Sequence, residues 1–164
     1  MITLERSMRH LAWSDAWLFA ALSEYPDEAF AARYAAGSWT VGEIAKHIVD
    51  GAEWYRYCLM GEPWTDIAPL TSGAEAAGLA AHLRAVDDML VAQCQLPDAI
   101  VSFDDENGPV SVHRSTLLSQ ACLHAVEHRA QIACALEAGG FAPLALDDVD
   151  FWSFERYEAA ASGD

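Results

Sequence analysis

Residues 117–132 read LLSQACLHAVEHRAQI, a pattern from which the type of fold can be inferred. Leu117 and Ala121 recur at helical spacing, and His124, His128 and Gln131 continue the same stripe. Residues four apart on a helix point in directions that differ by only about 40°. Two imidazoles therefore share an otherwise apolar helix face. Such a face needs other helices to cover it, so the stretch predicts a helical bundle.

In the rest of the chain, the apolar periodicity predicts three more long helices. The four expected long helices cover residues 2–24, 40–60, 72–96 and 111–138. T-x-x-E at Thr40 and S-x-x-E at Ser72 are typical of capping boxes at helix starts. Gly139 and Gly140 end the fourth helix.

Shorter elements are expected between and after these helices. DEAFAARYAA (residues 27–36) predicts a short helix stopped by Gly37, and the tail predicts a closing helix begun by Asp147 or Asp148. IVSFDDENGPVSV (residues 100–112) has two β-type runs around a Gly-Pro turn, which predicts a hairpin or an extended loop. No fixed-period repeat or linker interrupts the pattern. We therefore predict one all-α domain over residues 1–164, a four-helix bundle with short additional helices.

Composition restricts the classes of function. The 25 acidic and 9 basic residues give a formal charge of −16, which opposes approach to nucleic acid phosphates and anionic lipids. We expect neither nucleic acid nor membrane as a partner. The four cysteines form no C-x-x-C pair, and MITLERSMRH lacks the apolar run of a signal peptide. These features predict a cytoplasmic protein with reduced thiols.

A third histidine is expected on an inward helix face. His47 lies between Ile44 and Gly51 on the apolar stripe of the second helix. Together with His124 and His128 it can supply a three-histidine metal site, which leaves one coordination position for water or substrate. On the residues alone, hydrogen-bonded core histidines remain the alternative. Surface positions are expected for the other three histidines, His10, His82 and His113.

Three neighbours of His47 are candidates for the same site. Asp50 is offset from His47 by about 60° around the helix. At this offset it could be a fourth ligand, a base or only a polar neighbour. Trp54 points within about 20° of His47 and could form an apolar wall or belong to the core. Gly51 between them could leave room for a ligand or permit close helix packing.

Four polar residues elsewhere have open interpretations. Gln131 could support a metal-bound histidine or make an unrelated core hydrogen bond. Asp15 lies in the apolar stripe of the first helix, so it either bonds a neighbouring helix or supports the site. Arg129 points about 100° away from its histidine neighbour and is expected to pair with an acid. Glu127 is either a general base or incidental to the pair of histidines.

The motifs together resemble a known family. WTVGEIAKHIVDGAEW (residues 39–54) with LLSQACLHAVEHRAQI resembles the DinB-like family, also called YfiT-like. LAWSDAWLFAAL (residues 11–22) resembles its first helix, with Asp15 where an Asn is usual, and DVDFWSFER (residues 148–156) resembles its closing helix. The resemblance implies a four-helix bundle whose divalent ion, commonly nickel or zinc, is held by the residues matching His47, His124 and His128. Iron is a further option.

The resemblance also decides between two interpretations of the fourth helix. His124, Glu127 and His128 spell H-x-x-E-H, the zinc motif of inverted metalloproteases with Glu as base. That match is confined to five letters, and such proteases are much larger and carry a third, acidic ligand far downstream. We therefore expect a bundle site rather than a protease site.

Two reaction classes fit an ion held by neutral imidazoles. In one, activated water attacks a small electrophile with Asp50 or Glu127 as base. In the other, the ion activates a low-molecular-weight thiol for S-transfer or isomerisation, which the resemblance favours because relatives include thiol-dependent enzymes. The alternative is a non-catalytic metal-binding or structural bundle. An apolar face of the first or closing helix could form a homodimer, although core burial explains it equally.

Overall fold

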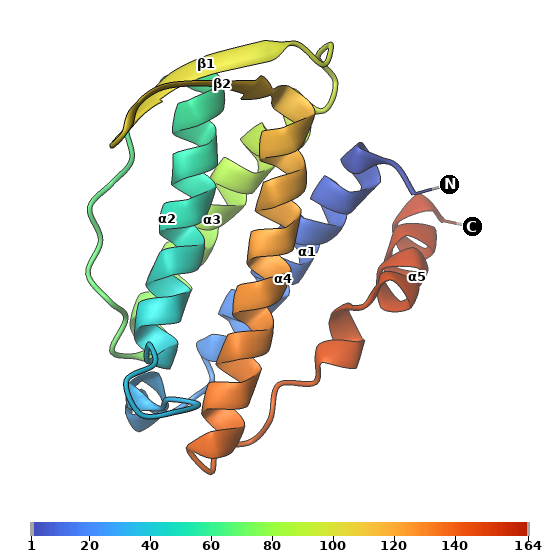
Figure 1. Cartoon of the computed structure of the whole chain (residues 1–164). Helices are drawn as coiled ribbons and strands as arrows, with labels where there is room; N and C mark the ends of the chain where they lie inside the picture. The colour runs from blue at the N-terminus through green and yellow to red at the C-terminus, as the bar shows by residue number, and fades with distance from the viewer. Residues whose placement is uncertain (1, 164) are drawn as a thin grey trace.

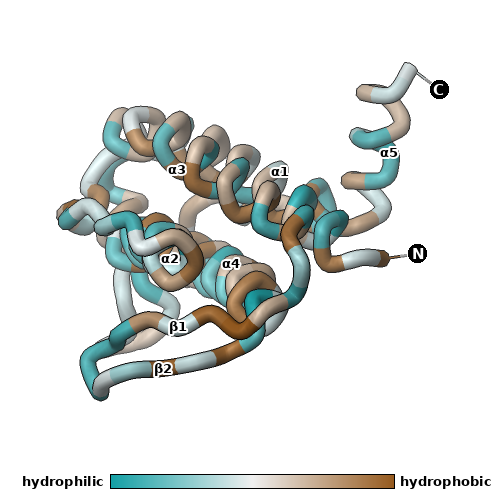
Figure 2. Tube along the Cα trace, turned by 90° about the horizontal axis from the view of Figure 1, so that it is seen from above, coloured by the Kyte–Doolittle hydropathy of each residue, from teal (hydrophilic) through white to brown (hydrophobic). Residues whose placement is uncertain are grey.

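Four long helices form the bundle in a computed structural model that describes residues 2–163 (Figure 1). They are α1 (Leu4–Leu22), α2 (Val41–Met60), α3 (Gly73–Gln93) and α4 (Arg114–Ala138). Helices α1 and α2 each lie beside both α3 and α4, so the four helices pack as a square, as the view from above shows (Figure 2). The predicted all-α four-helix bundle is confirmed. None of the helices in residues 2–163 has the length and apolar character that crossing a membrane requires.

A hairpin covers the end of α2 and α4 (Figure 1). Strand β1 (Ile100–Asp105) pairs antiparallel with β2 (Gly108–His113), from Ile100 opposite His113 to Asp105 opposite Gly108. The predicted Gly-Pro turn is wrong, because Gly108 and Pro109 are paired within β2. The chain turns earlier, where the Asp105 carboxylate accepts the backbone N–H of Asn107 at 2.7 Å. Residues 111–113 continue β2, so α4 begins at Arg114 and not at residue 111.

Capping side chains account for the helix starts. Thr40 and Glu43 form the predicted capping box of α2. At α3, Ser72 accepts the N–H of Glu75, but the Glu75 carboxylate bonds the N–H of Thr71 at 2.6 Å, so the second predicted box is only half formed.

The shorter helices differ from the prediction in their bounds. Residues 27–36 contain only a 3-10 helix, η1 (Asp27–Ala31). Near the C-terminus, Asp147 and Asp148 belong to a second 3-10 helix, η2 (Leu146–Val149), which precedes α5 (Phe151–Ser162). The predicted start of the closing helix is therefore wrong. The cap of α5 is Asp150, whose carboxylate accepts the N–H of Ser153 at 2.7 Å.

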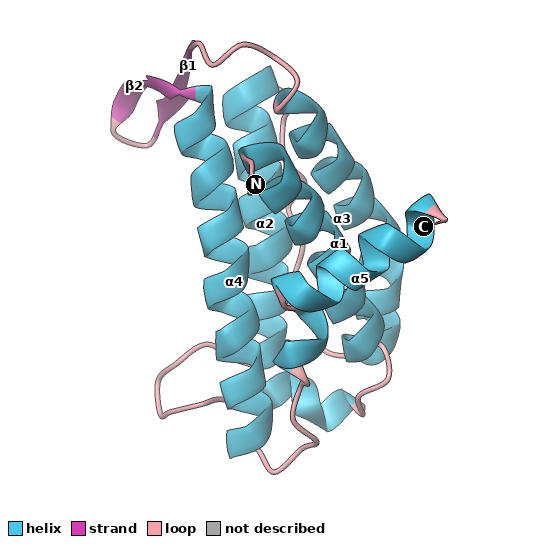
Figure 3. Ribbon diagram, turned by 90° about the vertical axis from the view of Figure 1, so that its right-hand side faces the viewer, coloured by secondary structure: helices cyan, strands magenta, loops and turns pink. Residues whose placement is uncertain are grey.

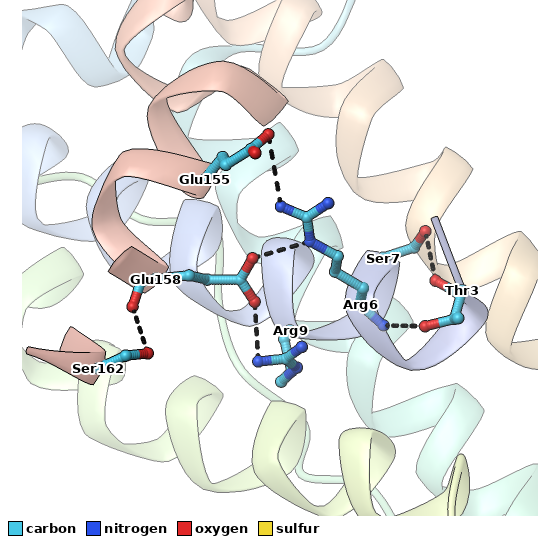
Figure 4. Close-up of polar contacts among 7 residues, drawn as sticks. All are labelled: Thr3, Arg6, Ser7, Arg9, Glu155, Glu158 and Ser162. Atoms are coloured by element: carbon cyan, nitrogen blue, oxygen red, sulfur yellow. Dashed lines mark hydrogen bonds and ion pairs between the residues drawn. The ribbon is translucent and has the colours of Figure 1, made fainter. Parts of the chain in front are cut away.

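Helix α5 stands at the side of the bundle, beside α1 (Figure 3). The Glu158 carboxylate accepts from Arg6 Nε and Arg9 Nη1, both at 2.8 Å (Figure 4). The predicted surface position of His10 is wrong. Its ring is buried, stacks on Phe151 with 4.3 Å between centroids, and lies 2.7 Å from the Val149 carbonyl oxygen. Folding of the C-terminal segment over α1 creates this environment.

The connection between α2 and α3, residues 61–72, is an extended segment that runs back along α2 (Figure 1). We call it the α2–α3 segment. The Leu70 N–H donates to the Gly42 carbonyl at 3.2 Å, which fixes the end of the segment at the start of α2. The segment therefore lies along a helix that carries one of the candidate metal ligands.

Candidate metal centre

Helices α2 and α4 bring the three predicted histidines together. Nitrogen atoms of His47, His124 and His128 all lie within 4.8 Å of one another. The ring centroids of His124 and His128 are 4.3 Å apart, and each lies within 4.8 Å of the His47 centroid. His128 is buried, whereas the other two rings are half-buried. The residues converge as the i, i+4 spacing on α4 and the inward stripe of α2 predict.

The spacing of the nitrogen donors fits one divalent ion. His47 Nε2 and His124 Nε2 are 3.0 Å apart. Zn–N bonds are about 2.0–2.1 Å long, so two nitrogens on one tetrahedral ion lie about 3.3 Å apart. Without an ion, one of these two nitrogens donates an N–H hydrogen bond to the other. The group of three histidines can hold a metal ion with little rearrangement.

Gln131 fixes the orientation of His128. The Gln131 Oε1 atom lies 2.8 Å from His128 Nδ1. An amide oxygen only accepts, so Nδ1 carries the proton and Nε2 keeps its lone pair for a ligand bond. Gln131 Nε2 in turn lies 3.5 Å from Glu127 Oε1. Glu127 is exposed and reaches the histidine cluster through this amide.

The absence of a side chain at Gly51 leaves the space that the His124 ring occupies. A Cβ atom at position 51 would overlap His124 Cε1 and lie 3.0 Å from its Nδ1. The free space at this glycine is thus occupied by a histidine, where the sequence suggested a ligand or close helix packing. Tyr55, one turn further along α2, packs edge-on against the same ring at 5.9 Å between centroids.

A cavity of about 260 Å³ lies beside His47. Asp50, Gly51 and Trp54 line it from α2, and Trp64, Thr65 and Asp66 line it from the α2–α3 segment. Asp50 is paired with Lys46, which also lines the cavity. Trp54 therefore lines the cavity next to His47, in the position that its spacing along the helix suggested.

Several neighbours of the centre were not found from the sequence. Trp39 precedes α2, so no helical periodicity places it, yet its ring lies 4.7 Å from the His47 centroid. The α2–α3 segment has no periodic pattern that could place it over the cavity. His82 was expected at the surface, and its side chain is 37% exposed, while its Nε2 lies 2.6 Å from the carboxylate of fully buried Glu53. His113 is exposed, as expected.

Asp15 and Arg129 form a buried ion pair, with Arg129 Nη1 donating to Asp15 Oδ1 at 2.6 Å. The expectation that Arg129 pairs with an acid is confirmed. Of the two interpretations of Asp15, the bond to a neighbouring helix is the one observed. The pair joins α1 to α4, and Arg129 directly follows His128 in the sequence.

Burial and repulsion between neighbouring rings lower the pKa of His47 and His124. Burial is the main cause that lowers the pKa of His124, and repulsion from His128 and His47 contributes, so that this pKa falls to about 4. Burial also lowers the pKa of His47, with His128 as the second cause. Neutral imidazole is the form that binds a metal, so near pH 7 the cluster is ready to bind an ion.

The lowered pKa of His124 predicts acid sensitivity of the metal-free fold. An unfolded histidine titrates near pH 6.5, whereas folded His124 titrates at about 4. Between these values the unfolded chain binds more protons, so the free energy of unfolding falls as pH drops from 6.5 toward 4. Allowing for solvent screening of this half-buried ring, we expect His124 to cost about 1 kcal/mol at pH 5. Urea unfolding of wild type and His124→Gln at pH 7 and pH 5 measures this, and equal pH dependence in both would contradict it.

Comparison with known proteins places the chain in a family. The profile of the DinB family matches residues 1–159. The chain belongs to the DinB family. None of the curated proteins with which the chain was compared is a match. DinB-family membership agrees with the predicted resemblance, and together with the histidine cluster it is compatible with a metal-dependent protein.

Proposed function

We propose that this DinB-family chain is a divalent-metal-dependent enzyme that acts on a small molecule at His47, His124 and His128. The observation that carries the proposal is the histidine cluster itself, with two Nε2 atoms 3.0 Å apart and a third ring oriented by Gln131. Three protein ligands leave a coordination position for a substrate, which is typical of catalytic rather than structural sites. Nickel and zinc are the proposed ions, with iron as a further option.

A bound divalent ion would act as a Lewis acid and lower the pKa of a water or thiol that it binds. The residues of the chain would do the rest. Asp50 lies at the cavity beside His47, held by Lys46, and is our candidate proton acceptor. Glu127 is exposed and would act through Gln131, by orienting His128. Trp54 and Trp64 would exclude water from one side of a bound substrate.

The proposed reaction is thiol-dependent S-transfer or isomerisation, with hydrolysis as the related possibility. The resemblance to thiol-dependent relatives supports the first. The cavity supports a substrate of small size, because about 260 Å³ lies at the lower limit of ordinary ligand pockets. A non-catalytic metal-binding or structural bundle is the alternative, and an open cavity next to one of the ligands, His47, argues against it.

Removal of single histidines tests the proposal. Purified protein without a polyhistidine tag is expected to contain about one nickel, zinc or iron per chain by elemental analysis. His124→Ala and His128→Ala should each lose the ion while keeping the helical circular dichroism of wild type. His113→Ala is the matched control, since His113 is exposed at the end of β2, and it should keep the ion. If wild type takes up no divalent metal even after reconstitution, the proposal fails.

A small-molecule substrate is the partner that we propose. The homodimer stays a prediction, with the closing helix as its proposed interface. Trp152 on α5 is 76% exposed, and large exposed aromatic side chains are enriched at protein interfaces. Sedimentation of wild type and Trp152→Ala would decide whether this side chain contributes to self-association.

A further inference from the structure

Glu53 is a fully buried acid on α2 that the metal centre does not use. Its side chain extends from α2 toward α3 and the α2–α3 segment. A buried carboxylate is costly unless its oxygens are hydrogen-bonded, so the partners of Glu53 indicate what it holds. Its Oε1 lies 2.6 Å from His82 Nε2 on α3, and its Oε2 accepts the backbone N–H of Thr65 at 2.7 Å.

A second bond from α2 reaches the same stretch of the segment. Arg56 Nη2 donates to the Pro63 carbonyl at 2.9 Å and lies 3.6 Å from Glu53 Oε1. Glu53 and Arg56 are therefore a buried acidic and a buried basic side chain that bind the backbone on either side of Trp64. The segment has no helix or strand of its own here, so these bonds are what fixes its path.

The stretch that these bonds hold is the outer wall of the cavity beside His47. Trp64, Thr65 and Asp66 line that cavity opposite the α2 residues. The Trp64 ring is half exposed and packs edge-on against Trp54 at 5.5 Å and Tyr57 at 5.1 Å between centroids. A displacement of the Thr65 backbone would move Trp64 with it and open the cavity.

We propose that Glu53 is a positioning residue that holds Trp64 as a selectivity wall, so that the site prefers ligands carrying a flat apolar group beside the ion-binding atom. The inference rests on the proposed function for the ion, but the attachment of the segment by Glu53 is independent of it. Trp64 and Trp54 offer two aromatic faces or edges to such a group. Glu53 touches no ligand and acts only through Thr65 and Trp64.

Two probes that bind a metal ion through the same kind of imidazole nitrogen test whether Trp64 determines selectivity. Imidazole and 1-benzylimidazole are titrated into the Co²⁺-loaded full chain, and the visible absorption of Co²⁺ reports binding of each. Wild type is expected to bind 1-benzylimidazole about tenfold more tightly than imidazole, because only the former buries apolar area against the tryptophans. Trp64→Ala and Glu53→Leu should bring the ratio of the two dissociation constants close to the value for the probes with free Co²⁺, with Co²⁺ uptake unchanged.

Conservative and distant variants separate positioning from general stability. Glu53→Gln keeps an oxygen that accepts from Thr65 N–H, so it should keep the wild-type ratio. Glu75→Leu is the matched control, because the Glu75 carboxylate bonds the N–H of Thr71 at 2.6 Å, at the other end of the same segment. It removes a similar bond away from the cavity and should also keep the ratio.

Hydrogen exchange of the metal-free protein gives a readout that needs no ion. The Thr65 amide should exchange at least about tenfold faster in Glu53→Leu than in wild type, and at the wild-type rate in Glu75→Leu. If Glu53→Leu does not fold, Thr65→Pro removes the donor N–H while Glu53 stays in place, and it should give the same loss of selectivity. Unchanged Thr65 exchange in Glu53→Leu, or an unchanged probe ratio in a folded variant that lacks the bond, would overturn the inference. Failure of Co²⁺ to bind wild type would instead overturn the proposed function, and the exchange rates would still decide whether Glu53 holds the segment.

Discussion

Gly51→Ala is expected to lower the affinity for the metal ion by about 100-fold without unfolding the protein. The new Cβ atom would occupy space that the His124 imidazole now fills, overlapping Cε1 and lying 3.0 Å from Nδ1. The obstacle is the far end of a side chain, so the ring can swing aside while α2 and α4 keep their positions. Alanine is also favoured over glycine within a helix by about 1 kcal/mol, which offsets part of the lost packing. We therefore expect the free energy of unfolding to change by less than about 1 kcal/mol.

Calorimetric titration with Zn²⁺ or Ni²⁺ measures the affinity, and urea unfolding of the metal-free protein measures the stability. Gly78→Ala is the matched control, since Gly78 lies inside α3 and a Cβ there meets nothing within 4 Å. It should bind the ion as wild type does. Wild-type affinity in Gly51→Ala would show that the position of His124 against α2 does not matter for the ion.

Helix positions could be predicted because they depend on local signals. The apolar period and the Thr40 capping box located α2 to within one residue. The hairpin turn could not be located in the same way, since Gly-Pro is a general turn signal and the Asp105 side chain makes the turn two residues earlier. The fourth helix was consequently predicted to start too soon.

The ligands of the candidate centre could also be predicted, whereas the residues around them could not. His124 and His128 share a face whatever the tertiary structure is, and His47 followed from its own helix stripe. Trp39, Trp64 and the partners of Glu53 depend on where irregular segments come to lie, which no periodicity encodes. His10 was misplaced for the same reason, because η2 and the start of α5 bury it.

Arg129→Met should produce the largest loss of stability, about 3–5 kcal/mol. Arg129 and Asp15 are both at least 95% buried, and removal of the cation leaves the Asp15 carboxylate uncompensated in the core. A second buried acid, Asp87, lies near this ion pair. Within residues 2–163 neither oxygen of buried Asp87 has a hydrogen-bond partner. Burial is the main cause that raises the pKa of Asp87 well above its usual range, and repulsion from Asp15 and Asp88 contributes. Arg129 makes its hydrogen bond to Asp15.

Urea unfolding of wild type, Arg129→Met and Asp15→Asn/Arg129→Met measures the effect. The double variant should recover part of the stability, because it removes the charge that the single variant leaves unpaired. Arg84→Met is the matched control, since Arg84 forms an exposed i, i+4 pair with Asp88 and should cost less than about 1 kcal/mol.

The pH dependence distinguishes an uncompensated charge from a simple packing defect. Burial already raises the pKa of Asp15, and Arg129 opposes this rise. Loss of Arg129 raises that pKa further, so in Arg129→Met the stability that depends on protonated Asp15 is present at low pH and lost as pH rises through the raised pKa. The deficit of Arg129→Met relative to wild type should therefore be smaller at pH 5 than at pH 7.5. A deficit independent of pH would mean that Arg129 stabilises the bundle through the packing of its side chain, since lost van der Waals contacts do not titrate.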